Sequence, residues 1–245
     1  MPHSKFLVHW TGHRDLEPLP EHDKKEKYAL RVKDWYQNGL FTRRTSDPEL
    51  AIRLSGPGPV NKLKNEEFVR LCFTEVRLSQ ADEHSKRYGR LGIGFTSDFI
   101  ANKGGRPVIY LPWEAKARLL EKSIFQAWEK AKSAGNVEIE QLLGSIVAFC
   151  KPMSEGPPGS PSYVNNYEEM EWRIVHEGSL DPSGTFGTDS VVPNAYRMKF
   201  DPADVALIVF PDQDVMLRTL NDSDMKSFFA LHQPNLLLLE DCRHF

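Results

Sequence analysis

The sequence contains few cysteines and no arrangement that would pair them or bind a metal with them. Three cysteines occur in 245 residues, Cys72, Cys150 and Cys242, and none of them lies in a CxxC pair. An odd number of cysteines cannot all pair within one chain, so we expect reduced thiols and a cytoplasmic protein. The eight histidines form no HExxH motif and no Cys/His quartet. We therefore expect no metal centre.

Long apolar runs and an excess of positive charge are also missing. No run approaches the roughly 20 apolar residues of a membrane-spanning helix, so we expect no membrane partner. The run Phe6-Leu7-Val8 is too short for the core of a signal peptide. The formal net charge is −3, whereas a large non-specific nucleic-acid footprint needs a strongly basic face. A local nucleic-acid groove stays open, because net charge does not report where the charges lie.

Residue spacing predicts most of the regular elements. Alternation predicts strands over 5–10, 68–76, 107–111 and 204–210. Helical spacing predicts helices over 23–37, 113–133, 215–220 and 222–231, with another that begins near 137. Glycine, proline and polar residues predict loops over 55–65, 152–162 and 179–194. We find no repeat and no dividing linker, so we expect residues 1–245 to form one α+β domain.

The most informative segment is EEMEWRIV, residues 168–175, which places three carboxylates within four residues. Its apolar and β-branched end predicts a strand, on which residues two apart share a face. Glu169 and Glu171 would then stand side by side, with Met170 and Trp172 on the other face. Two such close carboxylates repel and raise a pKa, which suits a site that binds a sugar hydroxyl or polarises a leaving group. The alternative is a solvent-facing edge strand whose charges block aggregation.

Two further segments stand out. His9 lies near the end of the first predicted strand, in HWTG, although a strand histidine is commonly a structural residue. The segment YGRLGIGF, residues 88–95, carries three glycines. Glycine lets a backbone or a ligand approach closely, but this spacing is not the dinucleotide fingerprint.

The order HWTG, YGRLGIGF, EMEWRIV resembles the ADP-ribosyltransferase fold, where a strand histidine, a middle strand and a late glutamate line one NAD cleft. A closer resemblance is to the AbiGi group of abortive phage-infection proteins, usually described as the antitoxin half of a two-part defence system. It rests on three segments between about residues 70 and 210, namely CFTEVRLSQADEHSKRYGRLGIGFTSDF, NKGGRPVIYLP and FDPADVALIVFPDQD. These resemblances imply a single α+β domain with a split, mainly antiparallel sheet and flanking helices, similar to an ADP-ribosyltransferase.

The transferase resemblance also implies a set of NAD-binding residues. His9 would hydrogen-bond the adenosine ribose, and the backbone of Thr11 and Gly12 would receive the nicotinamide amide. In the polymerase-like branch an aromatic side chain stacks on nicotinamide at the place that Gly94 takes here. Tyr88 would supply that ring if the strand register differs.

The same resemblance implies two catalytic carboxylates. Glu171 would bond the 2′-hydroxyl of the nicotinamide ribose and stabilise the oxocarbenium-like state as nicotinamide leaves. Glu169 would act as a general base toward the acceptor, while Glu168 would be a solvated neighbour.

Three functional hypotheses follow. In the first, a phage-defence protein binds NAD as substrate and transfers ADP-ribose to a nucleic acid or protein acceptor. In the second, a non-catalytic, antitoxin-like module neutralises a partner through its surface. For either hypothesis, a cognate toxin or antitoxin protein is a possible partner. In the third, an acidic cleft unrelated to NAD binds a sugar or nucleotide. The first requires His9 and Glu171 to face one pocket.

Overall fold

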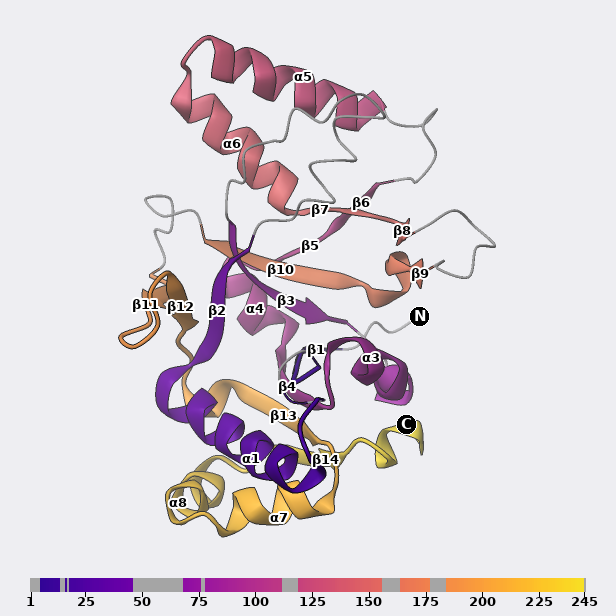
Figure 1. Ribbon diagram of the computed structural model, residues 1–245, viewed down its shortest axis with the longest axis vertical. Helices are drawn as coiled ribbons and strands as arrows, with labels where there is room; N and C mark the ends of the chain where they lie inside the picture. The colour runs from indigo at the N-terminus through magenta and orange to yellow at the C-terminus, as the bar shows by residue number, and fades with distance from the viewer. Residues whose placement is uncertain are drawn as a thin grey trace.

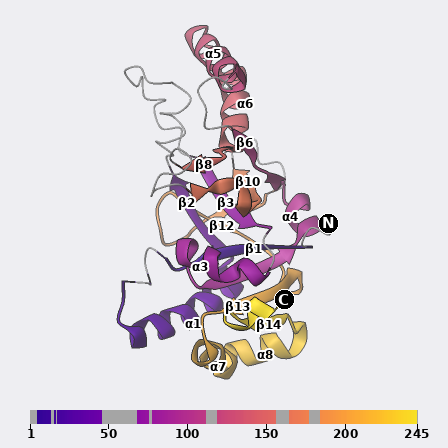
Figure 2. The same cartoon turned by 90° about the vertical axis from the view of Figure 1, so that its right-hand side faces the viewer.

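The computed structural model describes residues 5–13, 16, 18–45, 68–75, 78–111, 119–155, 164–176 and 184–244. A twisted sheet occupies the middle of the molecule, with helices at both ends (Figure 1). The helices at one end are α1 (Glu21–Asn38), α7 (Gln213–Asn221) and α8 (Ser223–His232). The other end carries the hairpin of α5 (Leu119–Ser133) and α6 (Val137–Ala148), which stands away from the sheet (Figure 2).

The main sheet has ten strands, and eight of them follow the order β11-β12-β2-β3-β1-β4-β13-β14. β10 pairs with β3 and β5, and every ladder of this sheet except β13–β14 is antiparallel. The strands are β1 (Phe6–Thr11), β2 (Leu40–Thr45), β3 (Phe68–Thr74), β4 (Leu91–Thr96), β5 (Arg106–Pro107), β10 (Glu171–His176), β11 (Phe186–Thr188), β12 (Ala195–Met198), β13 (Val205–Phe210) and β14 (Asn235–Leu238). The predicted α+β class, with a mainly antiparallel sheet and flanking helices, is confirmed.

Two short ladders lie outside the main sheet. The first joins β6 (Ile109–Leu111) to β7 (Cys150–Pro152), and the second joins β8 (Ser154–Glu155) to β9 (Val164–Asn165). The β6–β7 ladder brings the chain after α6 back beside β10. It thereby places residue 151 next to the acidic segment.

The split in the sheet lies along β3. One edge of β3 pairs with the whole length of β10, from His176↔Val69 to Glu171↔Thr74. The other edge is shared, because β2 pairs at its beginning and β1 pairs only at Val8↔Thr74. Backbone pairing between β1 and β3 is therefore sparse, and side chains supply further links across this gap.

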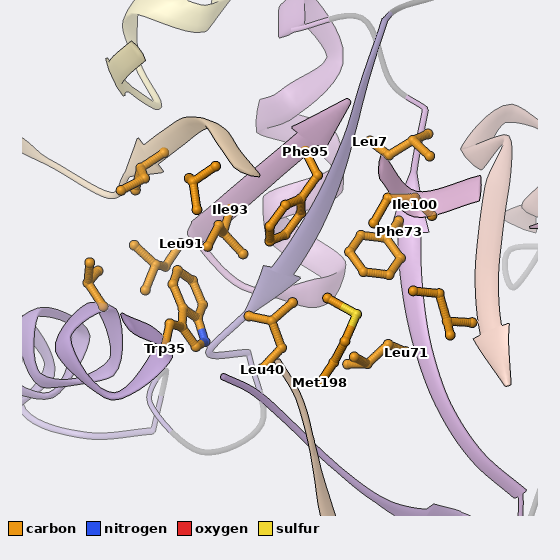
Figure 3. Packing of buried hydrophobic residues seen from close by; sticks show 14 of the residues in the cluster. Leu7, Trp35, Leu40, Leu71, Phe73, Leu91, Ile93, Phe95, Ile100 and Met198 are labelled. Atoms are coloured by element: carbon orange, nitrogen blue, oxygen red, sulfur yellow. The ribbon is translucent and has the colours of Figure 1, made fainter. Parts of the chain in front are cut away.

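Alternation in β1 separates two cores. Leu7 packs on one face with residues of α1, α7 and α8, including the buried Trp35. Figure 3 shows Leu7 and Trp35 with the aromatic and aliphatic side chains of β3 and β4 between them. Val8 and Trp10 pack on the opposite face, which α3 (Ala81–Tyr88) and the C-terminal 3-10 turn cover. The sheet is thus buried on both sides near β1.

Several sequence predictions need correction. The segment 40–45 is a strand, although its polar threonines and arginines conceal the alternation, and helix α3 was not predicted. The predicted loop 179–194 contains β11. Within the predicted loop 152–162, residues 154–155 form β8, whereas 156–162 lie outside the described residues, as does the loop 55–65. The helix predicted from 113 is described from Leu119 onward.

Candidate functional site

The two candidate catalytic carboxylates lie on different elements. Glu169 ends the 3-10 turn Asn166–Glu169, and Glu171 begins β10. Met170 between them has a φ of 43°, in the left-handed region that bulky side chains rarely adopt. Strand alternation therefore does not relate the two carboxylates, and that part of the prediction is wrong. The turn at Met170 nevertheless directs both side chains toward one cation.

Glu171 is held by two cations and is almost fully buried. Its Oε2 accepts a hydrogen bond from Lys151 Nζ at 2.7 Å, and its Oε1 accepts one from Arg173 Nε at 2.6 Å. The Arg173 side chain is only 4% exposed, and its Nη1 also donates to the carbonyls of Ala148 and Cys150. Both oxygens of Glu171 are thus engaged in buried, charge-assisted hydrogen bonds.

Glu169 is held in the same way from the other side. Its Oε1 accepts from Arg87 Nη1 at 2.6 Å and from the Tyr88 hydroxyl at 2.6 Å, and its Oε2 pairs with Lys151. Burial raises the pKa of the Tyr88 phenol, so the hydroxyl remains a donor. Lys151 therefore bridges the two carboxylates, and it links Glu169, which α3 holds, to Glu171 on β10. Glu168, by contrast, is exposed and accepts only from Asn165 Nδ2 among its described contacts.

The expected rise in carboxylate pKa does not occur at Glu171. Burial pulls its pKa upward, but the charges of Arg173 and Lys151 outweigh burial and lower the pKa to about 2. For Lys151, burial favours the neutral amine, yet Glu171, Tyr88 and Glu169 together raise its pKa above the ordinary value. The neighbouring cations outweigh both burial and the repulsion from the other carboxylate, so Glu171 is ionised and Lys151 is protonated at neutral pH.

Acid is expected to weaken this cluster. Because the folded pKa of Glu171 is about 2 against an ordinary 4.5, its stabilisation is complete above pH 4.5 and is lost as pH falls toward 2. We expect the difference in unfolding free energy between wild type and Glu171→Gln, whose amide does not titrate, to narrow across that window. Urea unfolding at a series of pH values measures this difference. A difference that stays constant from about pH 7 to about pH 3 would contradict the assignment.

His9 lies on the opposite face of the sheet from Glu171. Paired residues of a ladder share a face, and His9 pairs with Ile93 in one core, whereas Glu171 pairs with Thr74, which in turn pairs with Val8. His9 Nδ1 is 2.9 Å from the Cys72 carbonyl, so this nitrogen carries the proton and donates across the gap between β1 and β3. Burial lowers the pKa of the ring, which favours the neutral form.

Thr11 and Gly12 are occupied by neighbouring residues. Arg31 Nη1 donates to Thr11 Oγ1 at 2.8 Å, and the Gly12 carbonyl accepts the N–H of Leu16 at 3.0 Å. The backbone of Gly89 lies so close that a Cβ there would overlap the Thr11 carbonyl. The space that Gly89 leaves open is therefore filled by the Thr11 and Gly12 backbone and not by a ligand.

Gly94 has a structural role as well. It pairs with Val8 and Leu207, and a Cβ at this position would come within 2.7 Å of the Leu207 side chain. An aromatic ring at position 94 would overpack that core. The glycine that replaces the expected nicotinamide-stacking aromatic is explained by the packing of β13.

The six predicted site residues do not converge on one cleft. Tyr88, Glu169 and Glu171 meet around Lys151, whereas His9 serves the other face and Thr11 and Gly12 are packed against β4 and α1. This arrangement does not fit the NAD-binding set, and NAD binding stays a prediction.

Sequence reasoning missed the three cations of the cluster. Arg173 lies two residues after Glu171 on the same strand face, but nothing in the sequence links position 87 or 151 to that strand.

A pocket of about 580 Å³ opens beside this cluster, where β3 and β4 end and β1 and β10 begin. Of the six predicted site residues, Glu171 alone borders it. The other lining residues that matter for recognition are Lys5, Glu75, Asp98, Tyr110, Met170 and Trp172.

Within the described ranges, no three His, Cys, Asp or Glu side chains are placed together to hold a metal ion. Among the helices that the structure describes, none combines the length and the apolarity needed to cross a bilayer.

Comparison with protein families gives one match. The model of the family described as "Putative abortive phage resistance protein AbiGi, antitoxin" matches residues 63–211, more than half of the chain. The chain belongs to the AbiGi family. No curated protein and no solved structure matches it, so the resemblance to ADP-ribosyltransferases stays a prediction. The matched residues include β3, α3, the 3-10 turn that ends at Glu169 and β10, and thus both anchored carboxylates.

Proposed function

We propose that this protein acts in phage defence as an antitoxin that neutralises its cognate toxin by forming a complex with it, without catalysing a reaction. The family description supports an antitoxin role. The proposal that the protein does not catalyse a reaction is supported by the burial and the contacts of the two carboxylates. Glu169 and Glu171 are 1% and 5% exposed, and each of their four carboxylate oxygens contacts a cation.

A catalytic carboxylate must reach the reacting atoms, but these carboxylates form the links that join strand to helix. Stabilising a developing positive charge would require Glu171 to give up its hydrogen bonds to Lys151 and Arg173. Those cations would themselves oppose a positive charge on the substrate. The acidic segment is therefore best explained as an anchor for β10 and α3.

A second candidate has one observation in its favour. Glu171 borders the pocket, so a ligand there would lie close to a carboxylate that the transferase resemblance makes catalytic. In this candidate, NAD would be the substrate, and a nucleic acid or a protein would accept ADP-ribose.

Co-expression of this chain with the toxin of its defence system tests the proposal. We expect cell growth to be restored, the two proteins to elute together in size-exclusion chromatography, and the toxin to keep its unmodified mass. Calorimetry with NAD should give no binding heat. An ADP-ribose adduct on the toxin or on a nucleic acid, or restored growth without a complex, would favour the second candidate and overturn the first.

A further inference from the structure

The hairpin of α5 and α6 has a turn that the sequence specifies. Gly135 follows α5 with a φ of 65°, in the left-handed region that commonly ends helices. Asn136 then caps α6, because its Oδ1 accepts the Ile139 N–H at 3.1 Å. The two helices pack on each other, with Trp128 and Ala131 of α5 buried. The hairpin is therefore an ordered arm, and it stands away from the sheet (Figure 2).

One side of α6 is apolar and exposed. Ile139, Leu142 and Ile146 follow one another at intervals of three and four residues, which places them on one face of the helix. Their exposed fractions are 45%, 60% and 36%. The buried Ala148 lies about two and a half turns after Ile139 and therefore on the opposite side. α6 thus packs through one side and presents the α6 stripe, Ile139, Leu142 and Ile146, on the other.

The composition of α6 is typical of a buried helix. Only two of its twelve residues are charged, Glu138 and Glu140, and apolar residues occur on both of its sides. A helix that is apolar on both sides is normally covered by protein on both sides. Neighbouring exposed apolar side chains of this kind mark interaction surfaces in globular proteins. The α6 stripe therefore has the properties of a surface for another protein.

The charge of α6 is negative and lies beside the stripe. Glu138 is exposed in the first turn and precedes Leu142 by four residues, so the two side chains are neighbours on the helix surface. α6 contains no lysine or arginine, and neither Glu138 nor Glu140 forms an ion pair with another described residue. A helix whose apolar face is flanked by lysine or arginine would match both features. The α6 of a second copy would bring two more carboxylates and no cation.

We propose that the α6 stripe binds an amphipathic, basic helix of the toxin, an inference that rests on the proposed function. The apolar face of that helix packs on Ile139, Leu142 and Ile146, and its lysine or arginine side chains pair with Glu138 at the tip of the hairpin. Because the hairpin projects from the body, a helix can lie along α6 without displacing a strand of the main sheet (Figure 1). The family match at residues 63–211 includes the whole of α6.

Substitution within the stripe tests the apolar contact. Leu142→Glu places a charge in its middle, and Leu231→Glu is the matched control, because Leu231 is a 77% exposed leucine on α8, at the other end of the molecule. In calorimetry with the purified toxin of the same defence system, we expect Leu142→Glu to weaken binding at least about tenfold and Leu231→Glu to leave it unchanged. Circular dichroism and the melting temperature verify that both variants fold. Equal affinities of the two variants would overturn the proposal.

Charge reversal tests the basic character of the partner helix. Glu138→Lys changes the charge beside Leu142, and Glu240→Lys is the control at an exposed glutamate outside the hairpin. We expect Glu138→Lys to weaken toxin binding at least about fivefold at low salt, and the difference from wild type to shrink as salt screens the exposed charges. Toxin binding by Glu138→Lys that is as tight as that of Glu240→Lys would show that the bound surface is not basic.

The two proposals fail in different ways. If the toxin complex forms and Leu142→Glu binds as tightly as wild type, the toxin helix is wrong and the antitoxin function stands. If the chain alone is a dimer in size-exclusion chromatography and Leu142→Glu is a monomer, a second copy occupies the stripe, and the toxin helix is again wrong. If no toxin complex forms with wild type, the antitoxin function itself fails.

Discussion

Replacing Glu171 with glutamine is expected to lower the unfolding free energy by about 3–5 kcal/mol, because removing one partner of a buried ion pair leaves the other charge uncompensated. The Arg173 guanidinium is 4% exposed, and the substitution would replace its charged acceptor at position 171 with a neutral amide. Lys151 would lose one of its two carboxylates. Urea unfolding at neutral pH measures the change.

Glu168→Gln is the matched control for that measurement. Glu168 is a neighbouring carboxylate, but it is exposed and accepts one hydrogen bond from Asn165. Its substitution is expected to change the unfolding free energy by no more than about 0.5 kcal/mol. If Glu171→Gln were as stable as the control and yet abolished a measurable transfer of ADP-ribose, Glu171 would be a catalytic residue and the anchor interpretation would be wrong.

Gly89→Ala is expected to cost more than about 3 kcal/mol of unfolding free energy, for two reasons that add. Gly89 has φ 113° and ψ 163°, a region that only glycine occupies readily. A methyl group there would also overlap the Thr11 carbonyl and lie 2.6 Å from the Gly12 nitrogen. Backbone atoms cannot move aside as a flexible side chain can. The contact between Gly89, which precedes β4, and the Thr11–Gly12 backbone at the end of β1 must therefore open.

Gly104→Ala separates these two causes. Gly104 has a φ of 84°, but a Cβ at this position would meet no atom of the described residues within 4 Å. Backbone strain alone then predicts a loss of about 1–2 kcal/mol. Equal losses at the two positions, measured by thermal or urea unfolding, would show that the Thr11 backbone does not press on Gly89. The Thr11–Gly12 backbone would then remain accessible to a nicotinamide amide.

The sequence predicts the parts of the fold that depend on local patterns. Alternation in residues 5–10 and the apolar run 204–210 locate β1 and β13 within a residue or two. Helix α1 follows from the spacing of Tyr28, Val32 and Trp35, which are all buried. Strand β2 was missed because its polar threonines and arginines hide any alternation of apolar and polar side chains.

The candidate site depends on contacts that no local pattern records. Lys151 reaches Glu171 because β7 pairs with β6 beside β10, and Arg87 reaches Glu169 because α3 covers the same sheet face. The left-handed Met170 is also invisible in the sequence, since methionine has no preference for that conformation. The spacing of the acidic residues therefore pointed to Glu169 and Glu171, but their role depends on cations such as Arg87 and Lys151 that lie far from them in the sequence.

Titration of a fixed amount of toxin with this protein, in the absence of NAD, tests the central claim most directly. A binding antitoxin occupies toxin molecules one by one, so we expect toxin activity to fall linearly and to vanish at a fixed molar ratio. Neutralisation by far less than a stoichiometric amount, or neutralisation that requires NAD, would show turnover and would contradict an antitoxin whose buried carboxylates serve the fold.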